Sequence, residues 1–531
     1  MSKTKAIWFG AKPDYTRKLC PDLPLNWDRE FRLLGIDFDG ELINMGRNFE
    51  SKLEEIEKML NSWTYRQISP YGKIAIIKSL ALSKISHLAL VIPTLSKIYL
   101  KKIEQILFKF LWSGKPDKVS RDHSKLSEKA GGLGMVDIKN FWTALKFSWL
   151  RRLVSTSAFW PKILINSINQ INNSDKNLSE IMSLGSTKLQ TIGKKFKNQF
   201  WKEVFVSIIA VMQGAIFSFP EKILLSPFWD NPAITRNNKP IKEATFPMLY
   251  PKIQFLSDFF KPGTNVLFTK QELELRHDLT IGLELYIELR FIINSAFQRL
   301  GLNSGKIPIL EYPQQPILIN VATMCKKGCG TYYKMLNKKK CLSSIMTERE
   351  TRWNTELGAN FGPLFWVASY AFTTSIKNDN RLKWQHYQIV RNSQFTNKKV
   401  NKFNPNVSPQ CSYCGLEPEI ISHLYFNCNN VKNLWLEIKA WLSGLNIDLP
   451  LVISSILFGI KKESYDSLLN FIILTAKQFI WATKFNFNTL SFQAFKNVLK
   501  HKLEELKYSY DYIEKPELFT PWLNVYNNVV L

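Results

Sequence analysis

Four potential zinc ligands lie within eighteen positions near the C-terminal end of the sequence. Cys411 and Cys414 form a C-x-x-C pair, and His423 and Cys428 form a second pair after a gap of eight residues. Tetrahedral zinc takes four sulfur or nitrogen donors, and a C-x-x-C turn supplies two thiolates from one loop. The spacing therefore predicts a structural zinc site, since four protein ligands leave no open position for catalysis. The alternative is a set of buried cysteines beside a core histidine.

The segment just upstream, residues 381–410, combines positive charge with aromatic rings. It holds six Lys or Arg residues and no acidic residue, and Trp384, Tyr387 and Phe403 are interleaved among them. Nucleobases stack on aromatic rings while lysines meet the phosphates, so the pattern favours binding of single strands or duplex ends. The alternative is an amphipathic helix whose rings belong to the protein core.

The whole chain is strongly basic, with 71 Lys and Arg against 44 Asp and Glu in 531 residues. A net charge of +27 with 13% aromatic residues indicates a polyanionic partner, RNA or DNA, ahead of an acidic membrane surface. The N-terminus shows no signal-peptide core, and the longest uncharged stretch, 204–220, falls short of the roughly 20 residues of a membrane helix. We therefore expect an intracellular protein of the cytoplasm or nucleus, not secreted, with no membrane partner and no evident small-molecule substrate.

Apolar periodicity near 3.6 residues predicts helices as the elements that position these groups. In the stretch Lys97–Trp112, Ile103, Leu107 and Phe110 fall on one face, whereas Lys101 and its basic neighbours fall on the other. Further helices are expected over 49–63, 74–90, 196–217, 283–300, 468–485 and 495–506. Gly131-Gly132-Leu133-Gly134 is expected to form a tight turn before a helix capped by Asp137.

The order of the motifs resembles the back half of a reverse transcriptase from a LINE-type (non-LTR) retrotransposon. The segments that carry the resemblance to its palm are Lys3-Thr4-Lys5-Ala6-Ile7-Trp8 and the primer-grip-like Leu33-Leu34-Gly35-Ile36. Those that resemble its thumb are Trp63-x-x-Arg66, Gly72-Lys73-Ile74 and Phe110-Leu111-Trp112-x-Gly114-Lys115. Lys383-Trp384 and the Cys/Cys/His/Cys set resemble its C-terminal zinc-binding region.

This resemblance implies a mainly α fold in five parts. They are a short β palm remnant with a primer-grip-like hairpin (1–47), a helical thumb (48–152), a helical connector (153–380), a basic and aromatic segment with the CCHC zinc module (381–445), and a C-terminal helical region (446–531). In the parent family this portion would grip the template–primer duplex and the element RNA. Candidate nucleic-acid contacts are Arg66, Lys73, Lys97, Lys101, Lys115, Lys383, Trp384 and Arg391.

Family members polymerise with two magnesium ions held by palm aspartates, including an adjacent Asp-Asp pair. No Asp-Asp pair occurs in this sequence. We therefore expect no polymerase activity from this chain alone, with magnesium bound only if the missing palm is present. Two alternatives stay open: a truncated gene model of an active RNA-directed DNA polymerase, and a zinc-scaffolded protein–protein interaction module.

Overall fold

The structure is a computed structural model that describes residues 5–6, 26–27, 30–39, 45–93, 97–250, 252–302, 316–324, 328–338, 347–375, 379–460, 466–485 and 490–530. The chain forms two compact units, each built from three separate stretches. Unit 1 comprises Met1–Tyr65, Ile77–Phe110 and Val136–Leu342, and unit 2 comprises Arg66–Ile76, Leu111–Met135 and Ser343–Leu531. The range 48–152 contributes to both units, and the five domain boundaries given above stay predictions.

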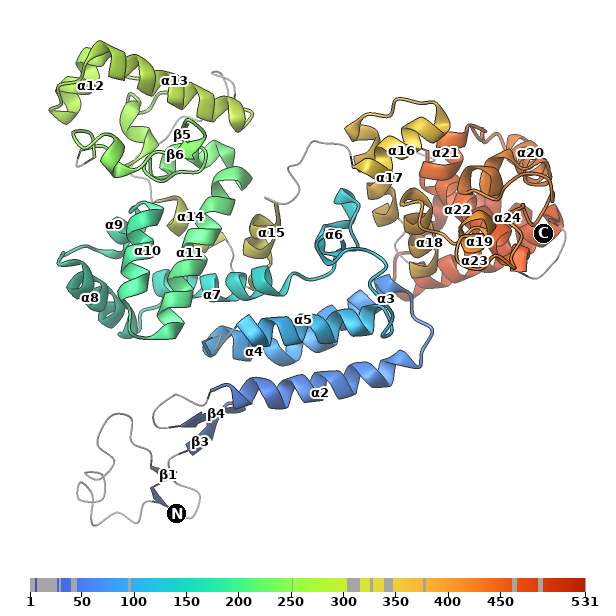
Figure 1. Ribbon diagram of the computed structural model, residues 1–531, viewed down its shortest axis with the longest axis horizontal. Helices are drawn as coiled ribbons and strands as arrows, with labels where there is room; N and C mark the ends of the chain where they lie inside the picture. The colour runs from blue at the N-terminus through green and yellow to red at the C-terminus, as the bar shows by residue number, and fades with distance from the viewer. Residues whose placement is uncertain are drawn as a thin grey trace. The chain divides into compact units, whose positions relative to one another are not determined.

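Helices dominate the described residues, which confirms the mainly α fold, and the strands form three two-stranded sheets (Figure 1). The strands are β1 (Lys5–Ala6) paired in parallel with β2 (Asn26–Trp27), and the antiparallel pairs β3 (Glu30–Leu33) with β4 (Ile36–Asp39) and β5 (Thr235–Arg236) with β6 (Lys239–Pro240). The β3–β4 hairpin turns at Leu34 and Gly35, which both have positive φ as a type I′ turn requires. Most of the motif Lys3–Trp8 lies outside the described residues.

The first long helices of unit 1 follow the predicted apolar stripes. Helix α2 (Arg47–Thr64) buries Phe49 and Leu53, and α5 (Lys97–Leu111) buries Ile103 and Leu107 while Lys101 stays exposed. Between them in unit 1 come η2 (Ile77–Ala81) and α4 (Leu82–Val91). Helix α7 (Ile138–Ser155) begins as predicted, because the Asp137 carboxylate accepts a hydrogen bond from the Asn140 N–H at 3.0 Å.

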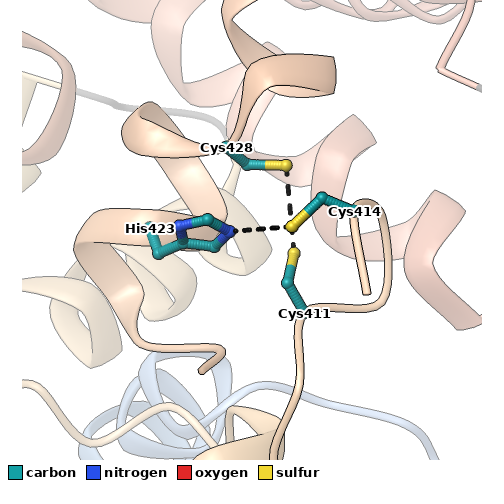
Figure 2. A group of neighbouring side chains, drawn as sticks. All are labelled: Cys411, Cys414, His423 and Cys428. Carbon is teal, nitrogen blue, oxygen red and sulfur yellow. Dashed lines mark hydrogen bonds between the residues drawn. The ribbon is translucent and has the colours of Figure 1, made fainter. Parts of the chain in front are cut away.

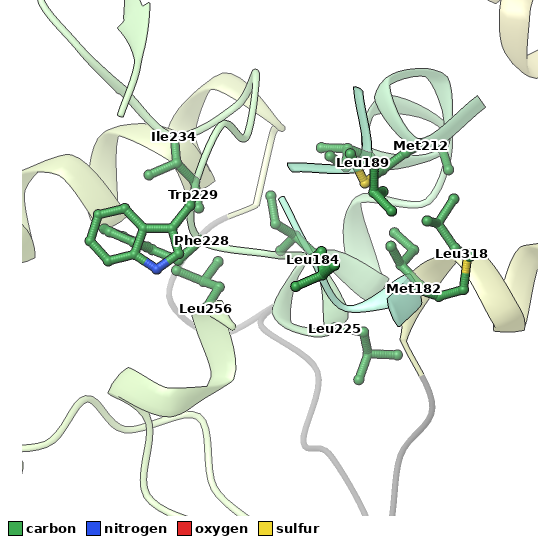
Figure 3. Close-up of a cluster of buried hydrophobic side chains, with 14 of the residues drawn as sticks. Met182, Leu184, Leu189, Met212, Leu225, Phe228, Trp229, Ile234, Leu256 and Leu318 are labelled. Atoms are coloured by element: carbon green, nitrogen blue, oxygen red, sulfur yellow. The ribbon is translucent and has the colours of Figure 1, made fainter. Parts of the chain in front are cut away.

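The rest of unit 1 packs around one large apolar core. Figure 3 shows part of it, where Phe228, Trp229, Met212 and Leu318 pack with other buried aliphatic side chains. The elements are α8 (Trp160–Asn172), α9 (Leu178–Met182), α10 (Ser186–Lys195), α11 (Gln199–Ser218), η4 (Pro220–Leu225), η5 (Glu243–Thr245), η6 (Leu256–Phe259), α12 (Lys270–His277), α13 (Leu283–Arg299), α14 (Ile317–Met324) and α15 (Gly330–Lys338).

Unit 2 has its own core, which runs from Trp353 to Val525 and includes two of the predicted zinc ligands, Cys411 and Cys428. Its elements are α3 (Pro70–Ile76), α6 (Arg121–Lys125), η3 (Glu128–Ala130), α16 (Glu348–Leu357), α17 (Pro363–Ser375), α18 (Asn380–Val390), α19 (Asn397–Asn401), η8 (His423–Asn427), α20 (Asn429–Ser443), α21 (Ile453–Phe458), α22 (Asp466–Phe485), α23 (Phe492–Tyr512), η9 (Pro516–Trp522) and α24 (Leu523–Val530).

Two helical stretches, Pro70–Val91 and Gln199–Ser218, are long and apolar enough to cross a membrane by length and composition alone. Half of the second stretch is buried inside the structure. In that stretch, helix α11, Phe205, Val211 and Ala215 belong to the unit 1 core. Core helices of water-soluble proteins pass the same test, so neither stretch by itself indicates a membrane span.

Candidate metal centre

The first ligand pair sits on a tight loop stabilised by backbone hydrogen bonds. The Cys411 N–H donates to the Glu417 carbonyl at 2.8 Å, and the Gly415 N–H donates back to the Cys411 carbonyl at 2.9 Å. Gly415 has φ of +66°, a left-handed conformation that glycine adopts without a steric cost. The Tyr413 N–H lies 3.5 Å from the Cys411 sulfur. The loop therefore holds the two thiols of Cys411 and Cys414 on the same side.

The second pair brackets one wide helical turn. His423 begins η8, a π-helical turn, and Cys428 ends it by donating its N–H to the His423 carbonyl at 2.9 Å. Cys428 is also the residue that precedes helix α20, so its sulfur lies at the positive end of that helix dipole. One helical turn therefore presents both ligands of the second pair together.

The four ligand atoms point toward a common centre (Figure 2) and all lie within 4.8 Å of one another. The Cys411 and Cys428 sulfurs are 3.9 Å apart, and the Cys414 sulfur is 3.3 Å from Nε2 of His423. With zinc–sulfur bonds of about 2.3 Å and zinc–nitrogen bonds of about 2.0 Å, a tetrahedron has edges of about 3.5–3.8 Å. The donors thus fit zinc in number, type and spacing, and they support the predicted structural zinc. A bound ion would cross-link the loop to the start of α20.

Two neighbours adjust the chemistry of these ligands. Oε2 of Glu417 lies 2.9 Å from Nδ1 of His423, outside the angle of a directed hydrogen bond. Nδ1 therefore faces the carboxylate, while Nε2 is the ring atom that lies beside the Cys414 sulfur. The hydrogen bond from Cys411, together with the backbone amides of Val431 and Asn430, lowers the pKa of the Cys428 thiol. The same hydrogen bond and burial raise the pKa of Cys411.

A buried ion pair that sequence reasoning did not identify anchors the zinc loop. Glu419 has no exposed surface, and its carboxylate pairs with the ammonium of Lys484 on α22. The same carboxylate accepts hydrogen bonds from the Asn397 N–H at 2.8 Å, the Ser412 N–H at 3.1 Å and the Ser412 hydroxyl at 2.9 Å. Because Ser412 lies between the two loop cysteines, Lys484 holds the zinc loop through Glu419.

Apolar side chains near the zinc ligands belong to the unit 2 core or pack against it. Leu424 and Trp435 are buried, and Tyr413 and Phe426 pack against them. The Trp435 indole N–H donates to the Tyr425 carbonyl at 2.8 Å. The zinc module thus shares one core with the C-terminal helices.

A comparison with known families points the same way as this geometry. Residues 331–435 match the family model described as zinc-binding in reverse transcriptase. This region is therefore a reverse-transcriptase-associated zinc module. The match spans all four ligands and also covers the basic and aromatic segment.

The predicted nucleic-acid contacts are not equally accessible. Arg66 and Lys115 in unit 2 and Lys101 in unit 1 are exposed, Lys383 and Trp384 are half-buried, and the side chain of Lys97 lies outside the described residues. Lys73 is only 4% exposed, and its ammonium donates to the Ser113 hydroxyl at 2.5 Å. Arg391 is 7% exposed and lies 2.5 Å from Nε2 of His123. Burial argues against phosphate contacts by these last two side chains.

Unit 2 brings the predicted thumb and the basic segment together through a chain of aromatic rings. Trp112 lies 6.2 Å from Trp384, which stacks on Tyr387 at 5.5 Å with an interplanar angle of 16°. Tyr71 packs edge-on against the same Tyr387 at 6.3 Å. Residues more than 250 positions apart in the sequence therefore form one cluster, which the sequence pattern did not predict.

Proposed function

We propose that this chain is the nucleic-acid-binding C-terminal portion of a non-LTR retrotransposon reverse transcriptase, which grips template–primer and element RNA. The main support is the half-buried ring of Trp384, which lies against the buried Trp112 in the aromatic cluster of unit 2. Lys115 and Lys118 follow Trp112 and are exposed, and Lys383 precedes Trp384. Accessible lysines from both sequence regions therefore lie near this cluster in the chain.

An exposed ring pair next to the zinc loop adds to this support. Phe395 and Phe403 are 52% and 66% exposed and pack edge-on at 5.9 Å. Lys398 and Lys402 lie beside them in the sequence and are exposed. Exposed rings flanked by cations suit unpaired bases, which stack while their phosphates meet the lysines.

The proposal assigns no polymerase step to this chain by itself. Nucleotide addition by two metal ions needs a set of carboxylates that clamps both ions. The sequence contains no adjacent Asp-Asp pair to supply the palm motif of the resembling family. We also propose that the chain acts inside the cell, on RNA and DNA and not on a membrane.

Fluorescence anisotropy with a labelled primer–template at several salt concentrations tests the binding. Neutralising phosphates releases counterions, so affinity should fall by about 10³-fold or more between about 50 and about 200 mM salt. The double variant Lys115→Gln with Lys118→Gln should bind more weakly and reduce the slope of log K against log salt by about 2.

A matched control is Lys432→Gln with Lys515→Gln, two exposed lysines of the same unit far along the chain from the aromatic cluster. This control should leave affinity nearly unchanged. Absence of binding at low salt would refute the proposal and favour a protein–protein interaction module. Equal loss in both double variants would refute the assignment of the surface.

A further inference from the structure

A groove in unit 1 has the features of a second binding site. It measures about 630 Å³ and lies between helix α8 and the residues that lead into helix α11. Its lining includes Trp160, Ile163, Lys195, Lys197 and Trp201, and none of the described residues that line it is Asp or Glu. Its volume falls within the range of about 300–1,000 Å³ that is typical of ligand sites.

Two tryptophans form an aromatic wall of this groove. The rings of Trp160 and Trp201 stack 6.1 Å apart with an interplanar angle of 26°, and both side chains are partly exposed. Trp149 packs edge-on against both rings, at 5.8 Å and 6.2 Å. The wall is therefore held in place from behind while part of each ring stays open to the groove.

Positive charge borders the same groove. Lys195 and Lys197 are exposed lining residues. Asn198, also in the lining, caps the 20-residue helix α11 by accepting a hydrogen bond from the Phe200 N–H at 2.8 Å. The positive end of a long helix dipole and two ammonium groups thus lie beside the tryptophans.

We propose that this groove binds a single-stranded nucleic acid, with one base against Trp160 and Trp201 and the adjacent phosphate near Lys195, Lys197 and the start of α11. Charge complementarity favours this occupant, because the described lining residues include two lysines and no acidic residue. An apolar peptide would carry no negative charge to pair with these lysines. The site lies in a different unit from the surface proposed above and does not depend on it.

Photo-crosslinking locates the strand directly. Short oligo-dT and oligo-U strands carrying one 5-iodouracil are irradiated with the full chain at low salt, and crosslinked peptides are identified by mass spectrometry. We expect a crosslink in the peptides that contain Trp160 or Trp201. The two strands distinguish DNA from RNA as the preferred ligand.

Variants then separate this groove from other sites. Lys195→Gln with Lys197→Gln should lower the crosslink yield at these tryptophans about tenfold at subsaturating strand. The control Lys239→Gln with Lys242→Gln, two exposed lysines of the same unit outside the groove, should leave the yield unchanged. Lys115→Gln with Lys118→Gln should also leave it unchanged, so failure of one site does not imply failure of the other.

Three outcomes would overturn the proposal. Crosslinks found only outside the groove would show that the strand does not enter it. A crosslink yield that is the same with and without the Lys195 and Lys197 substitutions would show that these charges do not contribute to binding. Competition by an apolar peptide, without competition by an unlabelled strand, would assign the groove to a protein partner.

Discussion

Replacing Lys484 by Met should strongly lower the local stability of the zinc loop and its affinity for zinc, although the residue lies 56 positions beyond the last zinc ligand. The change removes the only charged partner that the described structure gives to the Glu419 carboxylate. That carboxylate has no exposed surface and keeps only the Asn397 and Ser412 donors. An uncompensated buried charge costs about 3–5 kcal/mol when its partner is removed.

The exposed pair Lys439–Asp448 provides the matched control. Its charged atoms are 3.8 Å apart, and its two side chains are 41% and 84% exposed. Water screens such a pair, so Lys439→Met should change stability by less than about 1 kcal/mol. The difference in stability loss between the two Lys→Met variants therefore reports the effect of burying the ion pair, because both variants lose a lysine.

Local stability is measured by amide hydrogen exchange of peptides that cover residues 397–428, because a chain with two units need not unfold in one step. Zinc affinity is measured in parallel by competition with a chelator. Residues that support metal ligands typically contribute a factor of about 10–100 in affinity, so Lys484→Met should release zinc more readily.

A double-mutant cycle with Glu419→Gln completes the test. With the carboxylate neutralised, Lys484→Met should cost about 2 kcal/mol less than in the native background, because no buried charge is left alone. Additive costs, or an effect of Lys484→Met no larger than that of Lys439→Met, would refute the role of the ion pair.

Three further outcomes are expected. Cys411→Ser should abolish stoichiometric zinc in native mass spectrometry, whereas Cys329→Ser, which changes a cysteine of unit 1 outside the zinc cluster, should retain it. Burial lowers the pKa of Lys477 to about 7. Between about pH 7 and 10 the unfolded chain therefore binds one proton more than the folded chain, so the free energy of unfolding should rise with pH across that window. Lys477→Met should flatten this rise, as measured by urea titrations at several pH values. Gly132→Ala should destabilise unit 2 by about 1–3 kcal/mol in thermal unfolding, because its Cβ would collide with the Leu126 carbonyl, whereas Gly282→Ala, which meets nothing nearby, should be tolerated.

Short-range sequence patterns predicted the features that depend on residues close together in the chain. The apolar stripe of α2, the Asp137 cap and the grouping of the four zinc ligands depend on residues close together in the chain, and all three were found. The zinc spacing was informative because two ligand pairs on short turns leave few ways to arrange the donors.

Burial of charged residues could not be predicted in the same way. Lys73 and Arg391 were predicted to be accessible cations, yet both are buried in the folded chain. Their side chains contact Ser113 and His123, respectively. No local pattern singled out Glu419, because its partner Lys484 lies 65 positions away. Such pairs are set by tertiary packing, which carries no short-range periodic signal.

The discontinuity of unit 2 affects how the protein is made. Tyr71 and Trp112 leave the ribosome long before Tyr387 and Trp384, the rings they pack against, have been synthesised. Unit 2 therefore cannot complete its core until translation has passed the zinc loop, and until then its early pieces lack these packing partners. An expression fragment that starts at residue 343 would lack both early pieces, so a soluble version of the zinc region needs residues 66–76 and 111–135 supplied with it.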